Sequence, residues 1–188
     1  MPTPPPPLLL SLLLTLLISS AAASPKHDLV RRSCVHASYP DVCLRTLSSS
    51  SSSGAAATPR DLAQAAVRVS LAHVRKAAEY LAALRGSVAR REQGALGDCV
   101  EQMADTVDEL RKTMAALRQL RRGGGGAEFR WQMSNAETWV SAALTDEETC
   151  LDGFKEIGGE VRADVRKKVT NVARVTSNAL YLINLLDD

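Results

Sequence analysis

The segment TWVSAALTDEETCLDGF, residues 138–154, decides the fold predicted for this chain. Its many small residues suit a helix that packs closely against a neighbour, and a cysteine, Cys150, lies near its end. Ser134 and Glu137 have the spacing of a capping box, so we expect this helix to begin there and to end at about residue 152. The same spacing recurs at Thr145 and leaves open a break at that point. A cysteine at the end of such a helix suggests a disulfide to another part of the chain.

The start of the chain is typical of a secretory signal peptide. Residues 8–19, LLLSLLLTLLIS, are apolar or hydroxyl-bearing, and the SAAAS that follows favours cleavage after Ala23. Twelve such residues are too few to cross about 30 Å of hydrocarbon at about 1.5 Å per residue, which argues against a membrane anchor. We therefore expect residues 1–23 to be removed. The remaining residues, 24–188, should form a secreted domain without a membrane span.

Four cysteines in a secreted chain indicate two disulfides, and four cysteines allow three pairings. Cys34 and Cys43 lie nine residues apart in a segment of their own, whereas Cys99 and Cys150 lie 51 residues apart. This spacing favours the pairs Cys34–Cys43 and Cys99–Cys150. The alternative, a zinc site, would have only His36 near the first pair, and we expect no metal and no cofactor.

Apolar periodicity predicts an all-α fold. Residues 25–50 contain two short helical segments separated at Tyr39-Pro40, which gives a disulfide-stapled α-hairpin, and the serines 48–53 suit a flexible loop. Residues 58–188 contain four amphipathic helices, which predicts an up-down-up-down four-helix bundle. The first should run from Thr58 to Gly86, the second should begin after residues 94–97, and the fourth should carry the valines from Val161 onward. Apolar positions expected to face the core on the first bundle helix are Leu62, Ala65, Ala66, Val69, Ala72, Ala77, Tyr80, Leu81 and Leu84.

The composition excludes several classes of function. A net charge of +2 and an aromatic content of 4% leave neither the basic face nor the stacking platform of a nucleic-acid binder. The three histidines are scattered, and His73 falls beside an apolar stripe, where a packing role is expected. Nucleophile elbows, phosphate-binding loops and metal-binding Glu/His pairs are absent from the sequence, so we do not expect an enzyme.

One acidic strip is the best candidate for a binding surface. Glu101, Asp105, Asp108 and Glu109 fall at helical spacing along one side of the second bundle helix. Two interpretations remain open: an ordinary solvated face, or a docking strip for a basic protein partner.

Several motifs in the chain resemble those of the plant invertase/pectin methylesterase inhibitor family. They are YPDVCL at 39–44, ALGDCVE at 95–101, DTVDEL at 105–110, TWVSAALT at 138–145, TCLDGF at 149–154 and SNAL at 177–180. The resemblance implies a four-helix bundle behind an α-hairpin, with the first cysteine paired to the second and the third to the fourth. It also implies inhibition of either a pectin methylesterase or an acid invertase, with a one-to-one complex that weakens as the pH rises.

By this resemblance, the second and third bundle helices should cover the enzyme's active-site cleft. The residues that we expect to bind the partner are Glu101, Asp105, Asp108, Thr113, Ser141 and Thr145. The hydroxyls of Ser141 and Thr145 have an alternative role in helix packing, and Trp139 is expected in the core rather than at the interface.

The choice of target rests on a short motif. Invertase-directed members share a Pro-Lys-Phe element that this chain lacks, so pectin methylesterase is the favoured partner and acid invertase the alternative. A precursor pro-region resembles these inhibitors too, but the chain ends after the last helix, which favours a free-standing inhibitor. A secreted helical bundle that carries a lipid is a remote alternative. We expect the free protein to be a monomer in the apoplast.

Overall fold

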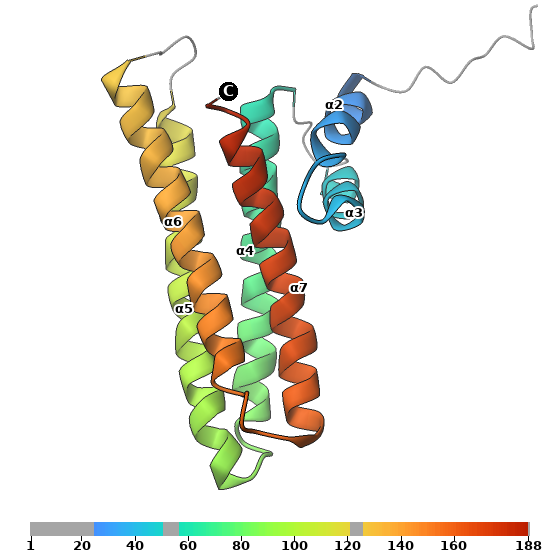
Figure 1. The fold of residues 1–188 in the computed structure, drawn as a ribbon, viewed down its shortest axis with the longest axis vertical. Helices are drawn as coiled ribbons and strands as arrows, with labels where there is room; N and C mark the ends of the chain where they lie inside the picture. Colours follow the sequence, from blue (N-terminus) through green and yellow to red (C-terminus); the bar gives the residue numbers. More distant parts are fainter. Residues whose placement is uncertain (1–24, 51–56, 121–125, 188) are drawn as a thin grey trace, which may run out of the picture.

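The chain folds into a helical hairpin and a bundle of long helices. This computed structural model describes residues 25–50, 57–120 and 126–187, and every regular element there is an α-helix. The elements are α2 (Pro25–Cys34), α3 (Pro40–Ser50), α4 (Pro59–Leu84), α5 (Arg90–Gln119), α6 (Ala127–Asp152) and α7 (Gly159–Asn184). Helices α4 to α7 run up-down-up-down, with the hairpin of α2 and α3 beside one end of the bundle (Figure 1). The predicted all-α architecture is confirmed. The predicted signal peptide lies outside the described residues.

The start of α4 is the one that the sequence marks most clearly. The hydroxyl of Thr58 accepts a hydrogen bond from the backbone N–H of Asp61 at 3.2 Å, and the Asp61 carboxylate accepts one from the N–H of Thr58 at 3.1 Å. Pro59 follows in the first turn, where its missing N–H costs nothing. Together these contacts satisfy backbone groups that would otherwise have no partner.

Two other helices begin earlier than predicted. Helix α5 begins at Arg90, because the side chain of Glu92 accepts a hydrogen bond from the N–H of Ala89 at 3.1 Å, and the glycines at 94 and 97 lie inside the helix. Helix α6 begins at Ala127, so Ser134 lies inside it and does not cap it. Nor does α6 break at Thr145, whose hydroxyl instead donates to the carbonyl of Ser141 at 3.2 Å.

The core runs the length of the bundle. Each bundle helix packs against two others: α4 and α6 each contact both α5 and α7. On α4 the buried face is rotated from the predicted one, because Val67 and Val74 are fully buried whereas Ala72 is exposed. Burying valine removes more apolar surface from water than burying alanine, which explains the choice of face. The largest fully buried apolar side chains are Leu62, Leu81, Leu96, Met103, Leu110, Leu117, Met133, Phe154 and Ile183.

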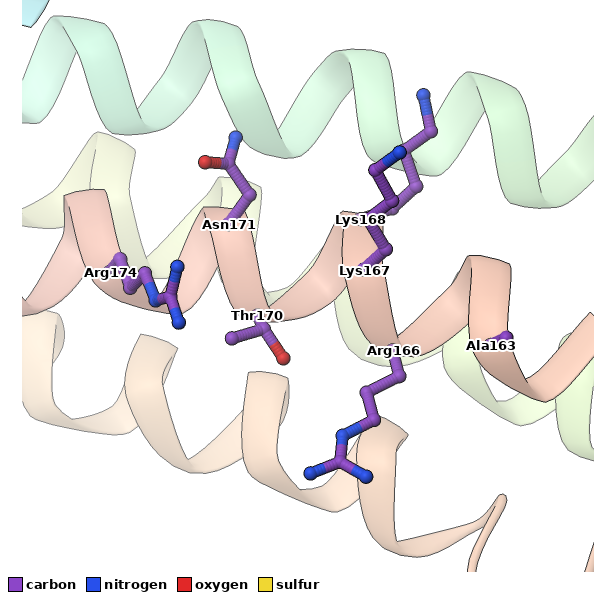
Figure 2. Close-up of a pocket in the computed structure, with 7 residues that line it drawn as sticks. All are labelled: Ala163, Arg166, Lys167, Lys168, Thr170, Asn171 and Arg174. Carbon is purple, nitrogen blue, oxygen red and sulfur yellow. The ribbon is translucent and has the colours of Figure 1, made fainter. Parts of the chain in front are cut away.

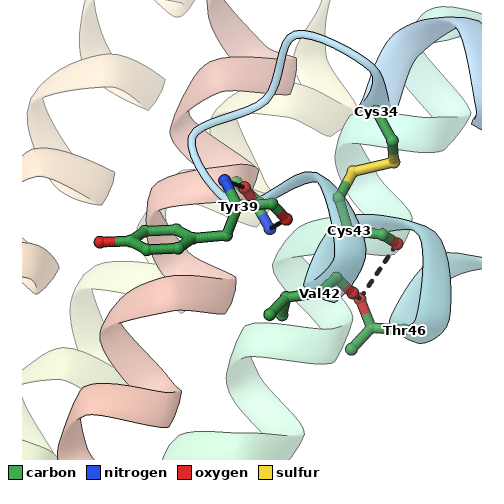
Figure 3. The surroundings of a disulfide bond; sticks show 6 residues. Cys34, Tyr39, Val42, Cys43 and Thr46 are labelled. Atoms are coloured by element: carbon green, nitrogen blue, oxygen red, sulfur yellow. Dashed lines mark hydrogen bonds between the residues drawn. A yellow bond between two sulfur atoms is a disulfide. The ribbon is translucent and has the colours of Figure 1, made fainter.

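Two cross-links shape the molecule. A disulfide joins Cys34 and Cys43, whose Cα atoms lie 5.6 Å apart, and so ties α2 to α3 (Figure 3). A second disulfide joins Cys99, in the third turn of α5, to Cys150 at the end of α6, with Cα atoms 4.4 Å apart. Helix α3 continues through Ser50, so the first three serines of the predicted loop are helical.

One buried asparagine fastens the hairpin to the bundle. The side-chain oxygen of Asn178, on α7, accepts a hydrogen bond from the N–H of Tyr39 at 2.9 Å. Its side-chain nitrogen donates to the carbonyl of Tyr39, also at 2.9 Å. The guanidinium of Arg174 lies 5.5 Å from the centre of the Tyr39 ring, which lies against α7 (Figure 3). Asn178, part of the SNAL motif, therefore positions the turn between α2 and α3.

Candidate partner-binding surface

Helices α5 and α6 lie antiparallel and present one continuous outer surface, which we call the α5–α6 face. At one end of the pair is the Cys99–Cys150 disulfide. At the other end, the amide of Gln132 donates to the side-chain oxygen of Gln119 at 2.8 Å. Between them, the ammonium of Lys112 lies 4.5 Å from the centre of the Trp139 ring. This register places the acids of α5 beside the middle and the end of α6.

In the acidic strip on α5, Glu101, Asp105 and Asp108 are exposed and Glu109 is half-buried, and the four differ in how their charge is compensated. Asp108 pairs with Arg111 at 2.7 Å, and Glu109 pairs with Lys112 at 3.0 Å. Glu101 and Asp105 are exposed, and neither has an ion pair within the described residues. Because Glu101 and Asp105 lack the cationic partner that Asp108 and Glu109 have, the strip keeps a net negative potential centred on Glu101 and Asp105.

Asp146 on α6 adds to this negative potential. Partial burial and the neighbouring carboxylates of Asp105 and Glu109 raise the pKa of Asp146 to about 6. Three carboxylates from two helices therefore lie close enough to repel one another. A cationic group from a partner, placed over Asp105 and Asp146, would relieve this repulsion.

The hydroxyl residues proposed for this surface do not all reach it. Thr113 is fully buried and its hydroxyl donates to the carbonyl of Glu109 at 2.9 Å, so the prediction that it contacts a partner is wrong. The Thr113 position lies on the inner side of α5, where a hydroxyl is tolerated because the helix backbone satisfies it. Ser141 and Thr145 are exposed on α6, and Thr145 lies next to Asp146. The structure thus brings Glu101, Asp105, Asp108, Ser141 and Thr145 to the α5–α6 face.

Trp131 is an exposed aromatic residue that the sequence analysis missed. It lies in the first turns of α6 with 62% of its surface exposed. Ser134, Thr138, Ser141 and Thr145 follow it at alternating spacings of three and four, all of them exposed, so they continue the same side of the helix. Exposed tryptophans are frequent anchors of protein interfaces. The signal was present in the sequence, but the predicted start of the helix at residue 134 excluded it.

Glu147 is a second residue that the sequence analysis missed. It is fully buried between helices, and one of its carboxyl oxygens accepts a hydrogen bond from the Thr176 hydroxyl at 2.8 Å. The other oxygen, also buried, has no hydrogen-bond partner. Burial raises the pKa of Glu147 to about 8. This carboxyl group belongs to the core and does not face the α5–α6 surface.

Other kinds of site find no support among the residues that the structure describes. No group of three or more His, Cys, Asp or Glu side chains there is arranged to hold a metal ion. His73 is half-buried, a ring nitrogen lies 3.0 Å from the side-chain nitrogen of Asn171, and burial lowers its pKa. Within the same ranges, no helix combines the length and apolar character needed to cross a bilayer.

Comparison with known proteins identifies the family. A family model described as plant invertase/pectin methylesterase inhibitor matches residues 28–182. This chain belongs to that family. Its relatives include pectinesterase inhibitor 3 of Arabidopsis thaliana, 57% identical over 166 residues that cover 86% of this chain and 80% of the relative. Pectinesterase inhibitor 9 of the same plant is 41% identical over 166 residues, covering 86% and 81% respectively.

Solved structures of the family support the fold. A crystal structure of a mutant form of a pectin methylesterase inhibitor from Arabidopsis matches with a TM-score of 0.64 at 22% identity, covering 81% of this chain and 93% of that one. A crystal structure of a pectin methylesterase inhibitor from Arabidopsis thaliana matches with a TM-score of 0.59 at 20% identity, covering 85% of this chain and 96% of that one. The resemblance drawn from the motifs is therefore confirmed at the level of family and fold.

Proposed function

We propose that this protein is a secreted inhibitor of pectin methylesterase that binds the enzyme one to one through its α5–α6 face. The observation that carries the proposal is the 57% identity to a relative named as a pectinesterase inhibitor, over most of both chains. The protein acts in the apoplast, where the enzyme demethylesterifies cell-wall pectin, and it is a monomer when free. It needs no cofactor.

The chemistry of the α5–α6 face indicates how it binds. Glu101 and Asp105 offer two carboxylates without an ion pair in the described residues, and Asp146 lies beside Asp105. The exposed ring of Trp131 lies further along the face, towards the start of α6. An interface built from a desolvated aromatic anchor and complementary charges suits an enzyme surface that presents basic side chains around its cleft. The inhibitor performs no chemistry; it excludes substrate by covering the cleft.

A paired titration tests the proposal. Oxidised protein is added to a plant pectin methylesterase and, separately, to a plant acid invertase, both at mildly acidic pH. We expect loss of methylester hydrolysis that saturates near one equivalent, with sucrose hydrolysis unaffected. Loss of sucrose hydrolysis alone would overturn the choice of target. If both enzymes keep their full activity in an excess of the protein, and circular dichroism shows that the protein is folded, then the protein is not an inhibitor of either.

A further inference from the structure

The two layers of the bundle carry opposite charges, although the whole chain has a net charge of only +2. Helices α5 and α6 contain twelve Asp and Glu residues against six Lys and Arg. Helices α4 and α7 contain nine Lys and Arg residues against four Asp and Glu. Helix α4 packs against α7 and α5 packs against α6, so an acidic layer and a basic layer lie side by side, although their charges nearly cancel over the whole chain (Figure 1).

The basic layer has its centre on the outer side of α7. Six residues at helical spacing, together with Lys168, line a hollow of about 620 Å³: Ala163, Arg166, Lys167, Thr170, Asn171 and Arg174. Figure 2 shows Lys167 and Lys168 directed towards α4 and Arg166 directed towards α6, with Thr170 between the cations. From residue 165 to the end of α7 there are four basic residues and no acidic one. We call this surface the α7 groove.

The cations of the α7 groove are not neutralised by neighbours. Within the described residues, none of the four lies within salt-bridge distance of a carboxylate. Lys168 lies 4.5 Å from the centre of the Tyr80 ring, a contact that orients the ammonium but leaves its charge. The acid before the groove, Asp164, accepts a hydrogen bond from the Tyr80 hydroxyl at 2.8 Å. The groove therefore keeps a concentrated positive potential.

The shape of the groove favours a linear polyanion over a small one. Arg166 and Arg174 are eight residues apart, about 12 Å along the helix axis, so a ligand that contacts both must extend along α7. The groove is open and has no buried polar pocket for a single anion. Single-stranded nucleic acids are bound largely through exposed rings on which their bases stack, and the two tyrosines nearby, Tyr80 and Tyr39, each carry a cation over the ring.

We propose that the α7 groove binds demethylesterified pectin, a linear polycarboxylate polysaccharide. The choice of polyanion rests on the proposed function, because each methyl ester that pectin methylesterase hydrolyses leaves a carboxylate on the polymer. The basic groups then form ion pairs with successive carboxylates, and the Thr170 hydroxyl lies among them to bond sugar hydroxyls. Since the groove and the α5–α6 face belong to different layers, one molecule holds the product polymer while it binds the enzyme. The inhibitor is thereby retained where demethylesterification has advanced.

Two pectins of equal length, one charged and one uncharged, show whether the α7 groove recognises the carboxylates of the polymer or its sugar backbone. The oxidised protein is titrated calorimetrically with polygalacturonate and with fully methylesterified pectin. We expect binding to polygalacturonate that weakens as NaCl is raised from about 0.05 to about 0.3 M, and none to the esterified polymer. Equal binding to both polymers, or none to either in low salt, overturns the proposal. So does tighter binding to single-stranded DNA or to anionic lipid vesicles of the same total charge.

A matched pair of variants locates the site. Arg166→Gln/Lys167→Gln removes two charges from the α7 groove and should weaken polygalacturonate binding about tenfold. Arg118→Gln/Arg130→Gln removes two exposed charges from the other layer and should change binding less than about twofold. Equal losses in the two variants would mean that only net charge matters and would overturn the assignment.

The same variants separate this proposal from the proposed function. Arg166→Gln/Lys167→Gln should inhibit pectin methylesterase on a short soluble substrate as well as the unchanged protein does. A loss of inhibition there would place the groove in the enzyme interface and overturn the two-surface arrangement. If the unchanged protein binds polygalacturonate but inhibits no pectin methylesterase, the proposed function fails while the groove stands.

Discussion

Because of the buried side chain of Glu147, we predict that the protein loses stability as the pH rises from the ordinary pKa of a glutamate, 4.5, to about 8. The carboxyl group is fully buried and one oxygen lacks a hydrogen-bond partner, so the charged form is strongly disfavoured in the fold. In the unfolded chain the same group ionises at its ordinary pKa. Below that pKa both states are protonated, and the contribution of Glu147 to stability is fully present.

The size of the loss follows from the two pKa values. Between pH 4.5 and about 8 the unfolded chain has released the proton while the folded protein keeps it, so folding takes up a proton. Each pH unit in this window lowers the free energy of unfolding by about 1.4 kcal/mol, a total of roughly 3 to 5 kcal/mol. Above the folded pKa both states are ionised and the loss is complete. This is a large fraction of the roughly 5 to 15 kcal/mol that stabilises an ordinary domain.

The variant Glu147→Gln isolates this effect. An amide of the same shape still accepts the hydrogen bond from Thr176 but cannot ionise, so the variant should match the unchanged protein within about 1 kcal/mol at pH 4.5 and exceed it by roughly 3 kcal/mol at pH 8. His73, whose pKa burial lowers, acts with the opposite sign, because its contribution is lost as the pH falls. Both proteins retain His73, so subtracting the stability-versus-pH curve of the unchanged protein from that of Glu147→Gln removes its contribution.

Urea unfolding followed by far-ultraviolet circular dichroism at pH 4.5, 6, 7 and 8 gives the required free energies. Glu79→Gln, which changes an exposed acid on α4, is the matched control and should run parallel to the unchanged protein. If the curves for Glu147→Gln and the unchanged protein are also parallel, the carboxyl group ionises in the fold without cost, and our reasoning from burial is refuted.

Three further predictions concern the surface and the hairpin. Glu101→Lys/Asp105→Lys should weaken inhibition of pectin methylesterase while the free energy of unfolding changes by less than about 0.5 kcal/mol; unchanged inhibition would make the strip an ordinary solvated face. Trp131→Ala should weaken inhibition by about 2 kcal/mol, measured as an inhibition constant, with thermal stability retained; a change under about twofold would exclude it as an anchor. Asn178→Ala should lower the free energy of unfolding by about 1 to 3 kcal/mol and expose the Cys34–Cys43 disulfide to reductant sooner; equal reduction rates would contradict its role in fastening the hairpin.

The fold could be predicted because it depends on regular spacing. Apolar residues three and four apart recur over the bundle segments, and connections between them are short enough to force antiparallel neighbours. The residues at which the helices begin were harder to predict. Gly94 and Gly97 each weaken a helix by only about 1 kcal/mol, which the packing of α5 against α4 and α6 outweighs. The capping contact of Glu92 with Ala89 has no Ser or Thr at the N-cap position, so it does not match the capping-box motif by which helix starts were predicted.

The candidate surface could be predicted only in part. Helical spacing placed Glu101, Asp105 and Asp108 along the outer side of the second bundle helix, whereas Thr113 was expected there only by the family resemblance. Thr113 is 100° or so further round the helix from the outward-facing Lys112, and a single residue step separates the surface from the core. A polar residue at such a boundary is compatible with both positions, because its hydroxyl can bond its own helix.

The run Asp146, Glu147, Glu148 shows why adjacent acids of similar chemistry have different fates. Successive residues of a helix are rotated by about 100°, so three neighbours on α6 must face three directions. Asp146 turns towards α5 and is half-buried beside Asp105, Glu147 points into the core against Thr176, and Glu148 faces solvent. Charge alone would make all three a solvated cluster. The rotation of α6 is set instead by Val140, Ala143 and Cys150, which share the inner side with Glu147, and their burial carries the glutamate inwards with them. The cost of that burial is reduced by keeping the proton, which is why the pKa rises and why the stability of the fold depends on pH.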